Sequence, residues 1–542
     1  MASTSKVPSQ CEDGVCRPIK DLESLLNWTK SDITWNEMVL DKSPRTEYVY
    51  DGSLDSLDKT RLVKSSTPKT LLCHDMKGGY LEDRFVRGTS DITDPYVFTQ
   101  WSMVDTFVYF SHHFVTIPPL GWINAANVHG VQVLGTIITE WTDGEALWQK
   151  LFEDQEKLDK MIDQLVNICN HCKFDGYLIN IENKVPAEHM DKMKYFVEKL
   201  TIEIHSRVKD SLIIWYDSII SPSGELKWQN ELNESNKEFF QSCDGIFLNY
   251  NWTEDTLKNS LENAGVRKHD VYVGVDVFGR GCFGGGGFNC DLAMEKIRQF
   301  GLSAAIFGQG WTHETKQDSE SFQEREILFW SKLKPYLYIH VMKFDKKVFK
   351  TNFNSGYGKF TFESGHKYGN NAMYSLSQQC IQPCSTHALE YEDGYTGTGC
   401  LKIKEQNKYH PLFLVQIETY SRFSLFLCTK CGSPYDYNLY VLYESKSDKD
   451  QKKHKFILMK DEKMDEKAFE DTDSTIIYNR NQKETDQTKK KQCWSKDSWD
   501  IRKFSVRPNF NGYVTQIGIE FKSTDCTGYN NELLLGSLTI YT

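Results

Sequence analysis

The stretch "FDGYLINIENKV" (residues 174–185) has the pattern of a buried strand that ends in polar side chains. Its apolar run, rich in β-branched and aromatic residues, predicts a strand over residues 176–182. Asn180 and Glu182 are two positions apart, so on an extended chain both side chains point to the same face. One carboxylate and one amide therefore lie together at the end of the strand. If the protein is a hydrolase with paired carboxylates, its second carboxylate must come from elsewhere.

The same pattern of apolar strand and polar ending recurs along the first part of the chain. Seven further runs cover residues 70–75, 106–113, 131–141, 212–218, 245–252, 271–281 and 304–311. Most are separated by charged stretches with helical periodicity, such as "PAEHMDKMKYFVEKLTIEIHSRVKD". Strands that alternate with helices form a parallel sheet covered by helices, and eight such units predict an α/β fold, the closed (β/α)8 or TIM barrel.

After residue 335 the pattern changes to short strands separated by Gly and Asn turns, which is typical of an antiparallel β-sandwich. We therefore expect three regions: an N-terminal extension over residues 1–34 that is partly disordered, a catalytic barrel over 35–338, and a sandwich over 339–542. A charge-rich insertion interrupts the sandwich at about 445–492. Its lysine run at 489–491 is more typical of a solvated loop than of a nucleic-acid site.

Composition and charge narrow the possible partners and the compartment. The net charge is −11 with acidic and basic residues interspersed, which argues against nucleic acid or an anionic membrane as the main partner. No stretch of about 18 apolar residues predicts a membrane span, and no apolar leader begins the chain. Most of the 15 cysteines lie in apolar segments, as expected for reduced thiols in a cytosolic protein. The oligomeric state cannot be read from these patterns.

Active sites of TIM barrels form where the strands end, so the residue types at these ends carry information. The eight runs end in carboxylates, amides, histidines and aromatic residues, including Glu140 and Trp141, and such sets favour a cleft lined for sugars. From these ends we expect the following residues to line the cleft: His74, Asp75, Asp217, Asn249, Asp276 and Phe278.

Three other motifs carry less weight. The run "GRGCFG" matches the dinucleotide pattern GxGxxG, but more glycine follows it instead of a helix, which favours a flexible loop. Two CxxC pairs, at 169–172 and 428–431, are not followed by a second pair at zinc-ribbon spacing, so core or loop thiols are favoured. No metal or organic cofactor is implied.

The opening stretch resembles two related signatures. "FDGYLINIE" is similar to the fourth-strand signature of chitinase-type barrels, but Leu178 and Asn180 stand where acidic residues would be expected. An Asn two residues before the Glu instead resembles glycoside hydrolase family 85, as do "LLCHDMKGGYLEDRF" (71–85), "WYDSI" (215–219) and "VGVDVFGRG" (273–281). This resemblance covers residues 35–335. The distal "ALEYEDGYTGTGCLKI" (388–403) resembles a galactose-binding-like jelly roll.

The resemblance implies an endo-β-N-acetylglucosaminidase that cleaves between the two GlcNAc residues of the N-glycan core. Such enzymes retain configuration because the substrate's own 2-acetamido group is the nucleophile, so N-linked oligosaccharides and glycoproteins are the expected partners. By match to the family motif, Glu182 is the general acid and base, Asn180 orients the acetamide, and Tyr216 lies near it. The resemblance also suggests which aromatic residues stack on the glycan: Trp122, Trp228, Trp252 and Trp311. A chitinase-like glycosidase and a non-catalytic lectin on the same scaffold remain alternatives.

Overall fold

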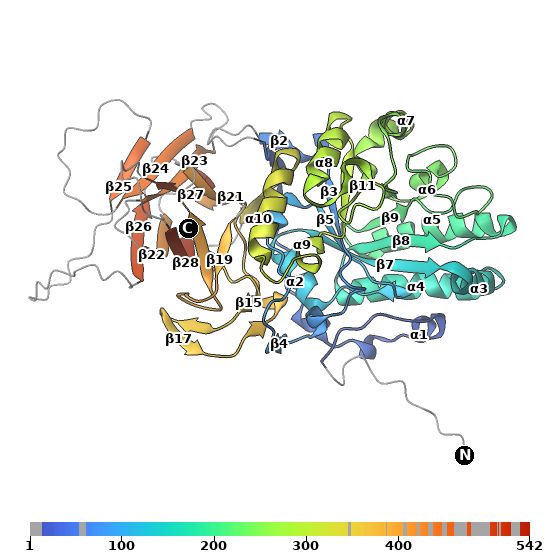
Figure 1. Cartoon of the computed structure of the whole chain (residues 1–542), viewed down its shortest axis with the longest axis horizontal. Coiled ribbons are helices and arrows are strands. Elements are labelled where there is room, and N and C mark those ends of the chain that lie inside the picture. The colour runs from blue at the N-terminus through green and yellow to red at the C-terminus, as the bar shows by residue number, and fades with distance from the viewer. Residues whose placement is uncertain are drawn as a thin grey trace, which may run out of the picture.

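The computed structural model consists of a barrel joined to a β-sandwich, on the right and left of Figure 1 respectively. The structure describes residues 14–53, 61–344, 348–385, 387–404, 409–419, 423–431, 437–446, 453–459, 474–478, 499–506, 508, 511–521 and 532–542. All statements below concern these residues.

Eight parallel strands form the closed barrel. Each strand pairs with the next one in the series, and β12 pairs with β3 to close the ring. Each of the eight apolar runs contains one of these strands, so the predicted TIM barrel is confirmed. The strands are β3 (Thr70–His74), β5 (Thr106–Tyr109), β7 (Gln132–Glu140), β8 (Gly176–Glu182), β9 (Leu212–Tyr216), β10 (Gly245–Leu248), β11 (Val271–Asp276) and β12 (Ser303–Phe307).

Helices cover the outside of the barrel. In α4 (Gln155–Cys172) apolar residues recur every three or four positions and are buried against the strands, while the Asp154 side chain accepts a hydrogen bond from the Lys157 N–H and caps the first turn. None of the described helices combines the length and apolarity needed to cross a bilayer. The other barrel helices are α2 (Leu120–Val128), α3 (Trp141–Phe152), α5 (Met190–Arg207), α6 (Lys237–Ser242), α7 (Glu254–Ala264), α8 (Cys290–Gln299), α9 (Trp311–Glu314) and α10 (Phe322–Leu333).

The N-terminal segment packs along one side of the barrel. Ile19 pairs with Val115 of the short strand β6 (Val115–Thr116), which in turn pairs with β7. The following helix α1 (Leu22–Leu26) contacts α4, where the Gln164 side chain donates hydrogen bonds to the carbonyls of Leu26 and Trp28. Residues 14–34 of the predicted extension are therefore part of the packed structure, whereas residues 1–13 lie outside the described residues.

The distal part forms two main sheets around a second hydrophobic core, which confirms the predicted antiparallel sandwich. The larger sheet has the order β2-β1-β13-β21-β27-β23-β24-β25, and the smaller has β19-β20-β28-β22-β26 with β14 beside β28. The strands are β13 (Tyr338–Phe344), β14 (Val348–Thr351), β19 (Ala388–Glu390), β20 (Cys400–Lys404), β21 (Tyr409–Thr419), β22 (Phe423–Cys431), β23 (Tyr437–Ser445), β24 (Lys453–Met459), β25 (Ser474–Tyr478), β26 (Asp500–Val506), β27 (Gly512–Phe521) and β28 (Glu532–Tyr541).

Two features differ from the three expected regions. The hairpin of β1 (Arg45–Asp51) and β2 (Arg61–Val63) comes from the predicted barrel range, but β1 pairs with β13 and so extends the larger sheet of the sandwich. Strands β24 and β25 lie within the predicted charge-rich insertion, most of which is outside the described residues.

Two smaller sheets complete the fold of the described residues. One joins β4 (Thr89–Ser90) to β18 (Met373–Tyr374) and β15 (Tyr357–Gly358), and the other joins β16 (Thr361–Glu363) to β17 (His366–Gly369).

Candidate active site

Asn180 and Glu182 lie on β8 with their side chains turned toward the inside of the barrel. Alternation along this strand places Leu178 in the cluster that fills the barrel, while Ile179 and Ile181 pack outward beneath the helices. Leu178 therefore forms part of the apolar floor below Asn180 and Glu182. Asn180 is only 5 % exposed, and its Oδ1 has no hydrogen-bond partner within the described protein. A buried acceptor without a partner is costly, so this oxygen is poised to accept a hydrogen bond from a ligand.

The environment of Glu182 favours its protonated form. Burial raises the pKa of this carboxyl, and the negative charge of Glu140 raises it further. Hydrogen bonds from Trp228 and Asn180 oppose the increase in pKa, and the Trp228 Nε1 lies 3.4 Å from the Glu182 Oε1. A raised pKa favours the protonated carboxyl that a general acid must provide.

Glu140 supplies the second carboxylate of the site. It is the register partner of Glu182 on the adjacent strand β7, and its Oε2 lies 3.5 Å from the Nδ1 of His112. The sequence identified Glu140 only as a strand ending, because the register between β7 and β8 is needed to place it beside Glu182. The structure thus adds Glu140 and His112 to the candidate site.

Tyr216 ends β9 and is almost fully buried. Its Oη donates a 2.9 Å hydrogen bond to the Oδ1 of Asn249, whose Nδ2 donates to the Oδ1 of Asn230 at 2.8 Å. Burial raises the pKa of Tyr216 well above its ordinary value, and the nearby Glu182 raises it further, so the phenol stays protonated. Asn249 is half-buried and orients Tyr216 through this contact.

Asp217 is fully buried and anchors the loop that carries Trp228. Its carboxylate accepts hydrogen bonds from the backbone N–H groups of Gln229 at 3.0 Å and Asn230 at 2.7 Å, and from the Asn236 side chain at 3.0 Å. Burial raises the pKa of Asp217 to about 6. Asp217 was predicted to line the cleft, but its oxygens bind protein groups, so it acts through the loop that positions Trp228.

Asp276 is also buried beneath the surface of the site. Its carboxylate accepts from the backbone N–H groups of Phe278 and Arg280 and forms an ion pair with the Arg280 guanidinium at 2.9 Å. Arg280 lies over the ring of Phe278, which is partly exposed. Thus Phe278 and Arg280 are exposed to solvent, while the Asp276 carboxylate fixes the backbone turn that carries them.

Asp75 is half-buried, and the charges of His112 and Arg280 partly offset the increase in its pKa that burial causes.

The four tryptophans that are predicted to stack on the glycan differ in their exposure. Trp228 is 39 % exposed beside Glu182, and Trp311 is half-buried beneath the Arg325 guanidinium. Trp122 is only 1 % exposed, because it stacks on Phe107 and donates to Asp83.

Two further predicted cleft residues are buried by contacts with protein. Trp252 is buried because it stacks on Phe283 and donates to the Gly274 carbonyl. His74 is buried against Trp122, its Nδ1 lies 2.7 Å from the Gln309 amide, and burial lowers its pKa to about 3. Packing thus occupies most of the surfaces of Trp122, Trp252 and His74, and their contact with the glycan stays a prediction.

The structure adds Trp141, an exposed aromatic residue that the sequence indicates only as the end of a strand. Trp141 follows Glu140 directly, is 66 % exposed, and has a backbone φ of +51°. A left-handed conformation is strained for a bulky residue and is often found at functional sites.

Within the part of the chain that the structure describes, no three His, Cys, Asp or Glu side chains are grouped so that they could hold a metal ion. Of the two CxxC pairs, Cys169 and Cys172 are both buried on α4, and Cys169 donates to the Phe174 carbonyl. These two thiols form part of the core.

Comparison with curated proteins finds close relatives. The chain is 49 % identical to the cytosolic endo-beta-N-acetylglucosaminidase of Gallus gallus over 322 residues, which is 59 % of this chain and 44 % of the relative. It is 44 % identical to the protein of the same name from Homo sapiens over 367 residues, or 67 % of this chain and 47 % of the relative. The chain spans about half the length of the curated relatives that it matches.

A similar fold is found among solved structures. The glycoside hydrolase domain of Endo-D from Streptococcus pneumoniae R6 superposes with a TM-score of 0.72 and 18 % sequence identity, covering 97 % of this chain and 83 % of that one. The model of Glycosyl hydrolase family 85 matches residues 80–361, just over half of the chain, and includes both strands that carry Glu140, Asn180 and Glu182. The chain therefore belongs to glycosyl hydrolase family 85.

Proposed function

We propose that this protein is an endo-β-N-acetylglucosaminidase that hydrolyses the β-1,4 bond between the two GlcNAc residues of the N-glycan core. The observation that carries this proposal is the pairing of an unpartnered, buried Asn180 oxygen with a carboxyl of raised pKa two residues later on the same strand. Family membership supports the reaction class, and both named relatives carry this activity in their names.

The first step forms an oxazolinium from the substrate's own acetamide. The acetamide oxygen attacks the anomeric carbon, the bond to the leaving GlcNAc oxygen breaks, and Glu182 transfers its proton to that oxygen. Asn180 Oδ1 accepts the acetamide N–H, which orients the attacking oxygen and stabilises the positive charge that develops. The protonated Tyr216 contributes a second polar contact near the same group.

The second step releases the sugar with retained configuration. Glu182, now ionised, takes a proton from water as the water oxygen attacks the anomeric carbon and the bond to the acetamide oxygen breaks. The products are an oligosaccharide with one reducing GlcNAc and a protein or peptide that keeps the other. Trp228, exposed beside Glu182, is suited to hold the leaving GlcNAc on its aromatic face.

We further propose that the enzyme acts in the cytosol on N-linked free oligosaccharides or misfolded glycoproteins. The names of the relatives support this compartment, as do the buried thiols of Cys73, Cys169, Cys172 and Cys290, which are not in disulfides.

A mass measurement tests the proposal directly. The chain is incubated with a high-mannose N-glycopeptide and with a GlcNAc oligomer, and we expect a product that keeps one GlcNAc on the peptide. Glu182→Gln should abolish this product, whereas Glu188→Gln, an exposed residue in the next loop, should not. Cleavage of the GlcNAc oligomer alone would favour a chitinase-like enzyme, and glycan binding without cleavage would favour a lectin.

A further inference from the structure

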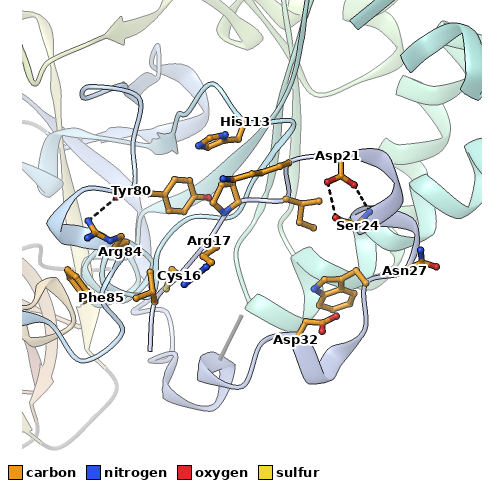
Figure 2. Close-up of a pocket in the computed structure, with 15 residues that line it drawn as sticks. Cys16, Arg17, Asp21, Ser24, Asn27, Asp32, Tyr80, Arg84, Phe85 and His113 are labelled. Carbon is orange, nitrogen blue, oxygen red and sulfur yellow. Dashed lines mark hydrogen bonds between the residues drawn. The ribbon is translucent and has the colours of Figure 1, made fainter. Parts of the chain in front are cut away.

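A second pocket lies between the N-terminal segment and the loop that follows β3 (Figure 2). Its volume is about 770 Å³, within the range of about 300–1,000 Å³ that is usual for sites of small organic ligands. Figure 2 shows Arg84 and Phe85 on one side, Asp21 and Asn27 on the other, and His113 at the top.

The walls of this pocket are held by backbone pairing. Val15 pairs with Phe85, and Ile19 exchanges two 2.9 Å backbone hydrogen bonds with Val115. The N-terminal segment is thereby fixed across the loops after β3 and β5. Residues 15–32 also precede the part of the chain that the family model matches, so one wall comes from outside the matched range.

The position of the pocket relates it to the reacting bond. His113 lines the pocket, and its neighbour His112 contacts Glu140, the register partner of Glu182. The pocket thus lies on the β5 side of Glu182. Trp228 belongs to the loop after β9, on the opposite side of β8. If Trp228 holds the leaving GlcNAc, the non-reducing part of the glycan extends toward the pocket.

Several charged groups of the pocket are already used by the protein. Asp21 caps α1 by accepting from Ser24, Asp32 accepts from the Thr29 N–H, and Arg84 donates to the carbonyls of Tyr80 and Leu81. These contacts fix the walls and leave the binding chemistry to other residues.

Two polar side chains of the pocket remain available. Among the described residues, neither Lys20, which is exposed, nor His113 has a hydrogen-bond or ion-pair partner. Burial lowers the pKa of His113, and the positive charge of Lys20 lowers it further, so the neutral imidazole offers one donor and one acceptor. The half-buried ring of Tyr80 adds aromatic surface, as does the half-buried ring of Phe85 on the face that the Arg84 guanidinium does not cover.

We propose that this pocket is a subsite for a neutral hexose branch at the non-reducing end of the N-glycan. Aromatic surface next to the neutral imidazole of His113 and the N–H donors of Lys20 suits the apolar face and the hydroxyl groups of a sugar. The inference rests on the proposed function for the identity of the glycan, but the binding test below does not require catalysis.

Selectivity between two substrates tests the subsite. The substrates are a glycopeptide with a branched, mannose-rich glycan and one trimmed to the first mannose. For His113→Ala and for Lys20→Ala, the kcat/KM of the branched substrate relative to the trimmed one should fall about fivefold, as expected for one lost hydrogen bond. Lys30→Ala, an exposed lysine of the same segment outside the pocket, should leave the ratio unchanged. An unchanged ratio in the two pocket variants overturns the proposal.

Calorimetry separates failure of this subsite from failure of the proposed reaction. The Glu182→Gln protein is titrated with the free branched mannose oligosaccharide, with and without His113→Ala. A weaker affinity in the double variant supports the subsite even if the wild-type protein cleaves nothing, and equal affinities overturn it. A sialylated oligosaccharide serves as the anionic probe. If Lys20→Ala weakens binding of the sialylated oligosaccharide alone, the assignment to a neutral sugar is wrong.

Discussion

Glu140 and Glu182 are register partners on adjacent strands, and the charge of Glu140 raises the pKa of Glu182. The enzyme therefore places two carboxylates side by side although the proposed mechanism uses only one of them for proton transfer. His112, 3.5 Å from Glu140, moderates the effect. This arrangement favours the protonated form of a carboxyl at the open end of the barrel, and it assigns Glu140 a role in tuning the acid.

Glu140→Gln should shift the alkaline limb of the pH profile to lower pH. Glu182 must be protonated for the first step, and loss of the neighbouring negative charge lowers its pKa, so the active form is lost at a lower pH. The pH dependence of kcat/KM measures this shift. Glu145→Gln, an exposed carboxylate on α3, is the control and should keep the wild-type profile. A shift toward higher pH would contradict the assigned role.

The same pair permits a test for a protein nucleophile. If Glu140 attacked the anomeric carbon, Glu140→Gln would stop turnover and Asn180→Ala would act only weakly. In the substrate-assisted reaction, Asn180→Ala should reduce hydrolysis by about 10²- to 10³-fold, because one preorganised contact to the transition state is lost. It should nevertheless retain activity on a preformed sugar oxazoline, measured as product formed from that donor. An equal loss of activity on the glycan and on the oxazoline would contradict the proposal that Asn180 orients the acetamide.

The sequence could predict the barrel because apolar strands and helical stretches recur along the chain. It could predict the facing of Asn180 and Glu182 because this depends on alternation within one strand. It could not separate Trp228 from Trp122, since an aromatic residue has the same pattern in a core and in a cleft. Nor could it place Glu140, which requires the register between two strands more than 40 residues apart. The pairing of β1 with β13 is likewise non-local, and it moves a hairpin from the barrel range into the sandwich sheet.

Trp228→Ala should change KM, whereas Trp122→Ala should change the stability of the fold. Trp228 is partly exposed and contacts Glu182, so we expect about a tenfold rise in KM with little change in thermal stability. Trp122 is enclosed by Phe107 and Asp83, so its removal should cost about 3–5 kcal/mol of unfolding free energy. Thermal melts and Michaelis curves of both variants distinguish the two roles. A rise in KM for a folded, stable Trp122 variant would restore its predicted place in the cleft.

Asp217→Asn should weaken substrate binding through the loop that carries Trp228. The amide keeps the size of the carboxylate, but its NH2 group faces backbone N–H groups that need an acceptor, which should cost about 2 kcal/mol and lower the melting temperature by about 5 °C. Asp318→Asn, an exposed loop residue, is the matched control. If Asp217 acts by positioning Trp228, the two effects on KM are coupled, so Asp217→Asn should add almost nothing in a Trp228→Ala background. Additive effects in this double-mutant cycle would mean that Asp217 affects the substrate by a route independent of Trp228.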